Sequence, residues 1–503
     1  MTMLREPRLD LNTCHIAPEA MQLIPESVAR KYGVMPLAVV NNALQVAMAE
    51  AGDVLALQAL EALVRMRIEP MVATAEEVRR AIDRNYKDYD EIQKQFKHLA
   101  PPPPRSEERS LAQAVAEAPA VRALDLLLNE AVKHRASDIH IEPEEDRLRI
   151  RLRIDGVLHE TLSLPLSAHG PLLSRLKVLA NMNIADSRPQ DGQFSARVMD
   201  CEVNVRVATI QTMYGQMGVL RILDKSFAAL GLTELGFLPG SLGIYQRMLR
   251  SPFGMILVSG PTGSGKTTTL YASINSLDRK RRNVITVEDP VEYRFKDINQ
   301  IEVNPKAGLT FASGLRSILR LDPNVILVGE IRDAETAEIA VQASLTGHLV
   351  LSSVHANDTV GALFRLLELG VQPFYVASAL LGVVAQRMVR RVCPHCRRLA
   401  PAPGEAQLAY GRELGEVRSE FSYGAGCNSC ANTGYLGRTA VFETLSVSEE
   451  VRKLLLAGAG SDQIRSEARK EGAVSMWRDG MLKAKAGITT PCEVLRNVFS
   501  VEQ

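Results

Sequence analysis

A segment of eight residues near the middle of the chain carries the residue types and spacing of a phosphate-binding loop. Its predicted phosphate-binding residues are Gly260, Pro261, Thr262, Gly263, Ser264, Gly265, Lys266 and Thr267. The glycines let backbone N–H groups converge on phosphate oxygens, Lys266 can reach the β- and γ-phosphates, and the Thr267 hydroxyl can bind Mg²⁺. Because an apolar run precedes the loop and a helix-compatible stretch follows it, the sequence predicts a binding site for ATP with Mg²⁺.

Two further apolar runs lead to a carboxylate. Val325–Val328 continues through Gly329 to Glu330, and Val284–Val287 leads directly to Glu288. A carboxylate at a strand end beside a phosphate loop can hold Mg²⁺ through water or orient an attacking water molecule. Both glutamates are therefore candidate catalytic residues, and the sequence leaves open which of them is the base.

Four of the seven cysteines form two C-x-x-C pairs, separated by 30 residues. The predicted metal ligands are Cys393, Cys396, Cys427 and Cys430. Four thiolates make a closed tetrahedral Zn²⁺ site with no open position for catalysis, so we expect a structural zinc. The long spacer is expected to carry its own helix. Three cysteines lack a spaced partner and are expected to be ordinary thiols: Cys14, Cys201 and Cys492.

A nucleotide site of this kind needs parallel strands whose carboxyl ends lie at one edge of a sheet. Between residues 236 and 392 short β-prone runs alternate with helical segments, which is typical of βαβ units around a largely parallel sheet. The four runs are 255–258, 284–287, 325–328 and 349–352. Each leads into a charged or polar residue, as expected where ligands bind at the carboxyl ends of strands. The predicted fold class is α/β.

A length of 503 residues predicts roughly three or four domains. The expected divisions are a small α/β docking module over 1–87, a charged, proline-rich linker over 88–110, a smaller α+β domain with a mostly antiparallel sheet over 111–235, the nucleotide domain over 236–392, a zinc module over 393–440 and a helical subdomain over 441–503.

Composition narrows the class of protein. Fifty-nine basic residues against 58 acidic ones leave a net charge of +1, which does not favour a nucleic-acid partner. Neither a signal peptide nor an apolar stretch long enough to span a bilayer is recognisable, so a cytoplasmic protein with reduced cysteines is expected.

Three segments of the predicted nucleotide domain resemble the aspartate box, the Walker B segment and the histidine box of the bacterial secretion ATPases. This family powers type II secretion and type IV pili. The three segments are Ile285–Tyr293, Leu319–Asp333 and Thr346–Asp358. The preceding domain resembles the same family over Arg135–Pro143, Arg153–Leu158 and Arg188–Gly192. The resemblance extends from about residue 110 to the end, and more weakly over 20–87. It implies a RecA-like P-loop ATPase domain preceded by a PAS-like domain.

The resemblance also implies roles for individual residues. Glu288 and Glu330 would share water activation and the organisation of Mg²⁺. His355, with His348 as a second candidate, would contact the γ-phosphate region. Arginines of both domains would surround the nucleotide, at the matching positions Arg206, Arg221, Arg316 and Arg320. Their forked guanidinium groups suit phosphate contact and transition-state charge.

For the whole protein the resemblance implies a motor ATPase of type II secretion, with the type IV pilus assembly ATPase as the alternative. It implies a homo-oligomer, a hexamer, on the cytoplasmic face of the inner membrane. The module at 1–87 would dock a membrane protein's cytoplasmic domain, and a polytopic platform protein would be a further partner. No paired Arg-Leu-Gly-containing repeat occurs there, so cyclic dinucleotide binding is not expected.

A basic cluster flanks the first cysteine pair: Arg387, Arg390, Arg391, Arg397 and Arg398. It fits acidic phospholipid headgroups, or is solvated or faces a subunit. From a different class of proteins, a zinc-containing nucleic-acid motor would share the phosphate loop and the cysteines. Near-neutral charge and the absence of a recognition-helix pattern argue against it. A guanine-nucleotide switch would need an Asn-Lys-x-Asp segment, which this sequence lacks.

Overall fold

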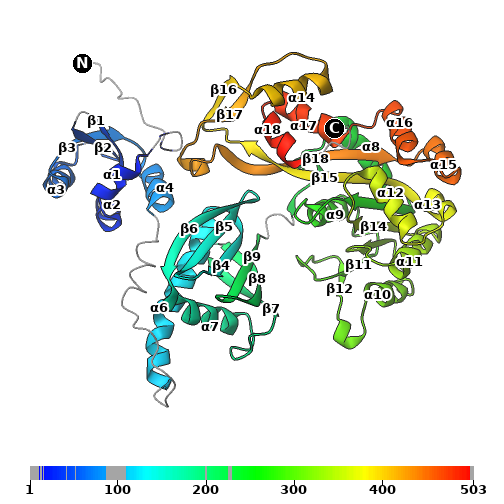
Figure 1. Ribbon diagram of the computed structural model, residues 1–503, viewed down its shortest axis with the longest axis horizontal. Coiled ribbons are helices and arrows are strands. Elements are labelled where there is room, and N and C mark those ends of the chain that lie inside the picture. The colour runs from blue at the N-terminus through cyan, green and yellow to red at the C-terminus, as the bar shows by residue number, and fades with distance from the viewer. Residues whose placement is uncertain are drawn as a thin grey trace. The chain divides into compact units, whose positions relative to one another are not determined.

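The computed structural model describes residues 11, 14, 16–40, 42–50, 52–86, 109–198, 201–224 and 229–498 (Figure 1). The predicted linker lies outside the described residues up to residue 108, and a helix already begins at Arg109. By its internal contacts the chain divides into two units. One comprises 1–224, 392–398 and 424–436, and the other comprises 225–391, 399–423 and 437–503. The predicted domain boundaries stay predictions.

The N-terminal module is a three-stranded sheet with helices, drawn in blue in Figure 1. Its elements are α1 (Pro18–Leu23), α2 (Glu26–Tyr32), β1 (Val34–Val40), β2 (Ala43–Met48), α3 (Val54–Val64), β3 (Arg67–Val72) and α4 (Ala75–Asn85). β2 pairs antiparallel with β1 and parallel with β3. A capping box between Thr74 and Glu77 begins α4, since each side chain accepts from the other's backbone N–H.

The next domain is a six-stranded antiparallel sheet with two helices. Its elements are α6 (Arg109–Lys133), β4 (Ala136–Pro143), β5 (Arg147–Ile154), β6 (Val157–Pro165), α7 (His169–Leu179), β7 (Gln190–Val198), β8 (Cys201–Thr212) and β9 (Gly215–Asp224). The strand order is β6-β5-β4-β9-β8-β7. Alternate residues of the strands, such as Leu148, Ile150 and Leu152 of β5, enter one core with the helices. The predicted antiparallel sheet is confirmed.

The nucleotide domain contains a mainly parallel sheet of seven strands, in the order β12-β11-β13-β14-β10-β15-β18. The strands are β10 (Gly254–Ser259), β11 (Val284–Glu288), β12 (Asn299–Glu302), β13 (Val325–Val328), β14 (Leu349–Val354), β15 (Leu380–Val392) and β18 (Tyr435–Ser446). All four predicted runs are strands, and the pairs among them are parallel. The predicted α/β class is confirmed. β18 joins this sheet although it lies beyond residue 392.

Both faces of this sheet are buried. Met255 and Leu257 of β10 enter one core, whereas Ile256 and Val258 enter the other. This explains why the strands read as uninterrupted apolar runs. The helices are α8 (Pro239–Leu249), α9 (Lys266–Asn275), α10 (Phe311–Ile318), α11 (Ala334–Leu345), α12 (Thr359–Glu368) and α13 (Pro373–Ala379). Among the residues described, no helix has the length and apolar character needed to cross a bilayer.

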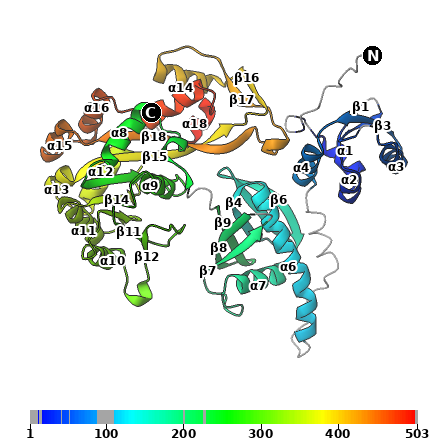
Figure 2. The ribbon, with the colours of Figure 1, turned by 180° about the vertical axis from the view of Figure 1, so that it is seen from behind.

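The remaining elements follow β15. Between the cysteine pairs lie β16 (Arg397–Pro401), α14 (Gly404–Leu414) and β17 (Glu420–Gly424), so the expected helix in the spacer is present (Figure 2). The last described helices are α15 (Glu449–Leu456), α16 (Ser461–Lys470), α17 (Met476–Lys485) and α18 (Pro491–Asn497). A buried ion pair holds α17 against β18, because Lys483 Nζ contacts Asp479 Oδ2 and the Ala440 carbonyl oxygen, each at 2.7 Å.

Candidate nucleotide site and cysteine cluster

The predicted phosphate loop joins the carboxyl end of β10 to the N-terminus of α9. Gly260 has φ +150°, and a Cβ there would lie 2.6 Å from the Gln386 carbonyl oxygen. Gly265 has φ +89°, in the left-handed region that side chains disfavour. The loop turns this tightly because glycine occupies these positions, and the first N–H groups of α9 have no partner within the helix.

Lys266 and Ser264 hold polar groups in this loop that a phosphate would satisfy. Lys266 Nζ donates to the carbonyl oxygens of Gly260 at 2.8 Å and Pro261 at 3.1 Å. Burial lowers the pKa of Lys266, and the nearby Glu330 carboxylate opposes this. Among the described residues the buried Ser264 Oγ has no hydrogen-bond partner. An ammonium group and an unused hydroxyl in a cradle of backbone fit an anion of phosphate type.

Glu330 lies next to this loop, just beyond the carboxyl end of β13. Its carboxylate binds Arg332, and its Oε2 lies 3.3 Å from Nε2 of His355, which follows β14. Burial acts to raise the pKa of Glu330, but Arg332, His355 and Lys266 together lower it. Arg332 also lies 3.6 Å from Asp289. The structure therefore brings Lys266, Glu330 and His355 together, as the sequence predicts.

Glu288 ends β11 and is 3% exposed. Three side chains donate to its carboxylate: Tyr271, Thr286 at 2.6 Å and Gln300 at 3.2 Å. The pKa of Tyr271 is raised by burial first and by Glu288 second, so its hydroxyl stays a donor. Glu288 is thus a buried, oriented carboxylate, whereas Glu330 is partly open and faces cations.

The structure does not bring the second candidate histidine, His348, to the phosphate loop of the same chain. His348 precedes β14, whose six residues separate it from His355. Its carbonyl oxygen accepts from Gly254 N–H at the start of β10, whereas the phosphate loop follows the end of that strand. His348 therefore lies at the opposite edge of the sheet.

The four candidate arginines fall into two pairs. Arg206 and Arg221 stand opposite each other on β8 and β9, and Arg221 Nε donates to Asp138 Oδ1 at 3.0 Å. Arg316 binds Glu335 at 2.6 Å, and Arg320 donates to the Arg316 carbonyl oxygen at 3.2 Å. This second pair lies at and beyond the C-terminal end of α10, which leads to the amino end of β13. The structure does not bring Arg316 or Arg320 to the phosphate loop of the same chain.

Two residues of the site were not predicted from the sequence. The buried Gln386 on β15 donates to the Ser264 carbonyl oxygen at 2.7 Å and accepts from Thr269 at 2.8 Å, which braces the loop against α9. Tyr271 positions Glu288 from α9. Tyr271 lies four residues after Thr267, on the same face of α9, so a helical projection could have found it. No local pattern indicates Gln386, because its contacts are 117 and 122 residues away in sequence.

The four predicted zinc ligands form one cluster, in which all four sulfur atoms lie within 4.8 Å of one another. The Sγ distances are 3.8 Å for Cys393–Cys427 and Cys427–Cys430, and 3.9 Å for Cys396–Cys430. Zinc–sulfur bonds of about 2.3 Å in a tetrahedron place sulfurs about 3.8 Å apart. Burial opposes ionisation of Cys430, but backbone N–H groups of Cys427 and Gly434 lower its thiol pKa. The cluster suggests zinc.

In the basic cluster around the first cysteine pair, two arginines contact other side chains and three are exposed to solvent. Arg390 binds Glu493 at 2.6 Å, and Arg387 donates to Asn357 at 2.9 Å. Arg391, Arg397 and Arg398 are exposed.

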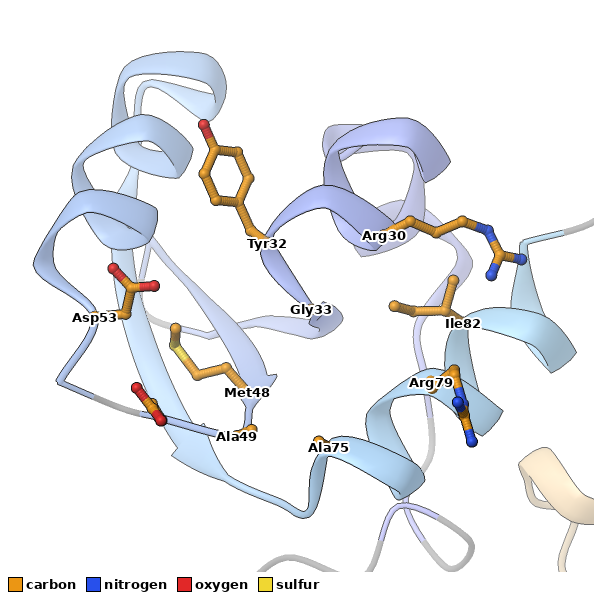
Figure 3. Close-up of a pocket in the computed structure, with 10 residues that line it drawn as sticks. Arg30, Tyr32, Gly33, Met48, Ala49, Asp53, Ala75, Arg79 and Ile82 are labelled. Atoms are coloured by element: carbon orange, nitrogen blue, oxygen red, sulfur yellow. The ribbon is translucent and has the colours of Figure 1, made fainter.

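The N-terminal module contains a cavity of about 410 Å³ with charges of both signs at its wall (Figure 3). Arg30 and Arg79 contribute positive charge, and Glu50 and Asp53 negative charge. Arg30 already binds Glu26 at 2.8 Å and Asp83 at 2.6 Å. The lining therefore includes two positive and two negative side chains.

The chain is similar to known proteins over most of its length. Residues 113–496 match the family described as type II/IV secretion system protein, and residues 4–91 match the MshEN domain. The chain is 47% identical to type II secretion system protein E of Klebsiella pneumoniae over 76% of each chain. It is 39% identical to the type IV pilus assembly ATPase PilB of Myxococcus xanthus over 98% of this chain and 88% of that protein.

The PilB of Thermus thermophilus is also 39% identical over 98% of this chain, which spans only 56% of that protein's length. Among solved structures, the pilus retraction motor PilT with bound ADP aligns at a TM-score of 0.52 and 24% identity, covering 74% of this chain and 96% of that one. That likeness shows the fold alone. By the family match and these relatives, the chain belongs to the type II/IV secretion system protein family and is an ATPase of this family.

Proposed function

We propose that this ATPase powers type II secretion, hydrolysing ATP to drive pseudopilus assembly and protein export across the outer membrane. The observation that carries the enzymatic part is the joint placement of the phosphate loop, Glu330 and His355 at the carboxyl edge of one parallel sheet. Identities of 44–47% to several type II secretion proteins, over 75–84% of this chain, support the type II system.

In the proposed reaction a water oxygen bonds to the γ-phosphorus of ATP, and the bond from that phosphorus to the β,γ-bridging oxygen breaks. ADP and inorganic phosphate leave, and a carboxylate accepts the water proton. Either Glu288 or Glu330 is the carboxylate that accepts this proton, and both, together with Thr267, would hold Mg²⁺. Mg²⁺, when bound, would neutralise charge on the phosphates. Lys266 releases the two loop carbonyls and contacts the phosphates instead.

The same proposal assigns roles to the four arginines and to the hexamer. The family resemblance gives Arg206 and Arg221 of the antiparallel domain a role toward the nucleotide, and within that domain Asp138 accepts from Arg221. Arg316 and Arg320 lie on the far edge of their own sheet, so in a hexamer they serve a neighbouring subunit. A change in subunit arrangement on hydrolysis would then move the partner proteins.

We place the enzyme at the cytoplasmic face of the inner membrane, docked through the N-terminal module to a membrane protein's cytoplasmic domain, with a polytopic platform protein as a further partner. Exposed apolar side chains on α3 support docking, since Val54 is 60% and Leu55 78% exposed. Acidic phospholipids fit the exposed Arg391, Arg397 and Arg398.

Type IV pilus assembly is the second candidate, because PilB proteins match 98% of this chain, including its N-terminal module. Deleting the gene in its host, with plasmid complementation, separates the two. Type II function predicts that extracellular enzymes accumulate inside the cells while surface pili persist. Loss of pili with normal export would assign the chain to pilus assembly instead.

A further inference from the structure

The five residues that follow β14, His355–Thr359, form a segment that we call the histidine loop. Each of its residues contacts a different segment of the structural unit that contains the nucleotide domain. The contacts are His355 with Glu330 at 3.3 Å, the Ala356 carbonyl oxygen with Ser259 Oγ at 2.9 Å, Asn357 with Arg387 at 2.9 Å, Asp358 with Arg465 at 2.7 Å, and the Thr359 N–H with Glu443 at 3.1 Å. A surface turn between a strand and a helix does not need five separate anchors.

Two of these anchors belong to the nucleotide site. Glu330 faces Lys266, and Ser259 directly precedes Gly260 of the phosphate loop. The beginning of the histidine loop is therefore fixed to the groups that surround the phosphates.

The other three anchors come from the C-terminal part of the chain: Arg387 on β15, Glu443 on β18 and Arg465 on α16. Arg465 reaches Asp358 across 107 residues of sequence, and their side chains are 23% and 17% exposed. Such a partly buried, charge-assisted hydrogen bond is stronger than an exposed ion pair. The far end of the loop is thus fixed to Glu443 of β18 and Arg465 of α16, neither of which forms a hydrogen bond or ion pair with the phosphate loop among the residues described.

Asp358 and Thr359 use these contacts to fix the start of α12. Asp358 Oδ1 accepts from the Gly361 N–H at 2.6 Å as the helix cap, while its Oδ2 binds Arg465. The carboxylate of Glu443 accepts both the N–H and the hydroxyl of Thr359. If either partner were lost, the cap could turn, and His355 three residues earlier would no longer be held at Glu330.

We propose that Arg465 and Glu443 are positioning residues for ATP hydrolysis, which hold His355 against Glu330 through the histidine loop. The inference rests on the proposed role of His355 in turnover. It makes the packing of α16 and β18 a determinant of the hydrolysis rate, so a partner that displaces these elements would change turnover without touching the nucleotide.

The test is a double-mutant cycle on the full-length protein, measuring kcat and KM for ATP hydrolysis and the melting temperature. The variants are Arg465→Gln, His355→Ala and their combination, with Arg452→Gln on α15 as an exposed control. We expect Arg465→Gln to lower kcat about tenfold with KM for ATP changed less than about twofold. In the His355→Ala background the same change should have an effect below about 1.5-fold, because its route to the reaction is gone.

Conservative replacement separates positioning from general packing. Arg465→Lys keeps the charge at Asp358 and should recover kcat to within about threefold of wild type. Glu443→Gln, which keeps an acceptor for Thr359, should lose less than Glu443→Ala. Arg465→Gln is expected to melt no more than about 5 °C below Arg452→Gln, because it loses one charge-assisted hydrogen bond. If Arg465→Gln unfolds, Glu443→Gln and Glu443→Ala take its place in the cycle.

Two results would overturn the inference while leaving the proposed function intact. One is wild-type kcat for Arg465→Gln and for Glu443→Ala, with His355→Ala impaired. The other is a full tenfold loss from Arg465→Gln in the His355→Ala background, which would show that it acts elsewhere. Wild-type turnover of His355→Ala itself would instead contradict the proposed role of this histidine, and with it the inference.

Discussion

The phosphate loop and the cysteine cluster are both built from short, tightly turned segments, but they differ in what their polar atoms contact. In the loop, Lys266 rests on backbone carbonyls and Ser264 Oγ has no partner among the described residues. In the cluster, sulfurs face one another at 3.8–3.9 Å with backbone donors around them. The first arrangement is open and suits a ligand that binds and leaves. The second is closed and suits a permanent ion.

Removing the loop's cation should have the largest effect. Lys266→Ala is expected to lower ATP turnover by about 10²- to 10³-fold, since a charge that stabilises the transferred phosphoryl group is lost. Phosphate release under saturating ATP measures this. Because Lys266 is not part of the core, the melting temperature should stay within about 2 °C of wild type. Turnover within a few-fold of wild type would show that the loop is not the hydrolytic site.

Mutating the cysteine cluster should instead lower the stability of the protein. Cys430→Ser is expected to remove most of the zinc and to lower the melting temperature by about 5–10 °C, because a structural metal contributes folding free energy. Metal analysis and thermal unfolding measure both quantities, with the exposed Cys492→Ser as the control. If the wild-type protein contains no metal, or if removing its metal leaves the melting temperature unchanged, the zinc assignment is contradicted.

The two histidines sharpen the contrast between the two edges of the sheet. His355→Ala should lower kcat about tenfold, as expected for a group that contacts the reacting region. His348→Ala lies at the other edge and should change kcat less than about twofold. Steady-state kinetics of the two variants check this. An equal loss of kcat in both would contradict the placement of His355 and His348 at opposite edges of the sheet.

A smaller effect concerns pH. The pKa of Glu330 lies below its ordinary value, so its ionised form is present above this lowered pKa and is lost as the pH falls through it. Arg332→Gln removes a donor and a positive charge, which raises that pKa. The acidic limb of the kcat profile should therefore move to higher pH, by about one unit. An unmoved limb would mean that Glu330 ionisation does not control turnover.

The features that could be predicted from sequence are those fixed locally. The four apolar runs became strands because a strand buried on both faces must be apolar throughout, and the loop and cysteine spacings follow from ligand chemistry. β12 was missed because its Asn299–Glu302 sequence is polar, as an edge strand permits. β15 was missed because its first residues continue the apolar stretch of α13, and apolar content alone does not separate a helix from a strand.

Contacts between distant segments could not be predicted. Gln386, Glu443 and Arg465 carry no local pattern, and each acquires its role only when the C-terminal elements pack beside the nucleotide edge. The position of His348 is a different case. Six residues, the length of β14, separate it from His355, so the sequence itself could have placed it at the opposite edge of the sheet.

The most direct test of the central claim is ATP turnover and ATP binding measured together on Glu330→Gln, which keeps the side chain's shape and removes its charge. The proposed site predicts turnover lowered at least about 10²-fold, with the Kd for ATP within about threefold of wild type, because the loop and Lys266 are intact. Turnover close to wild type would contradict the assignment of this edge of the sheet as the site of ATP hydrolysis.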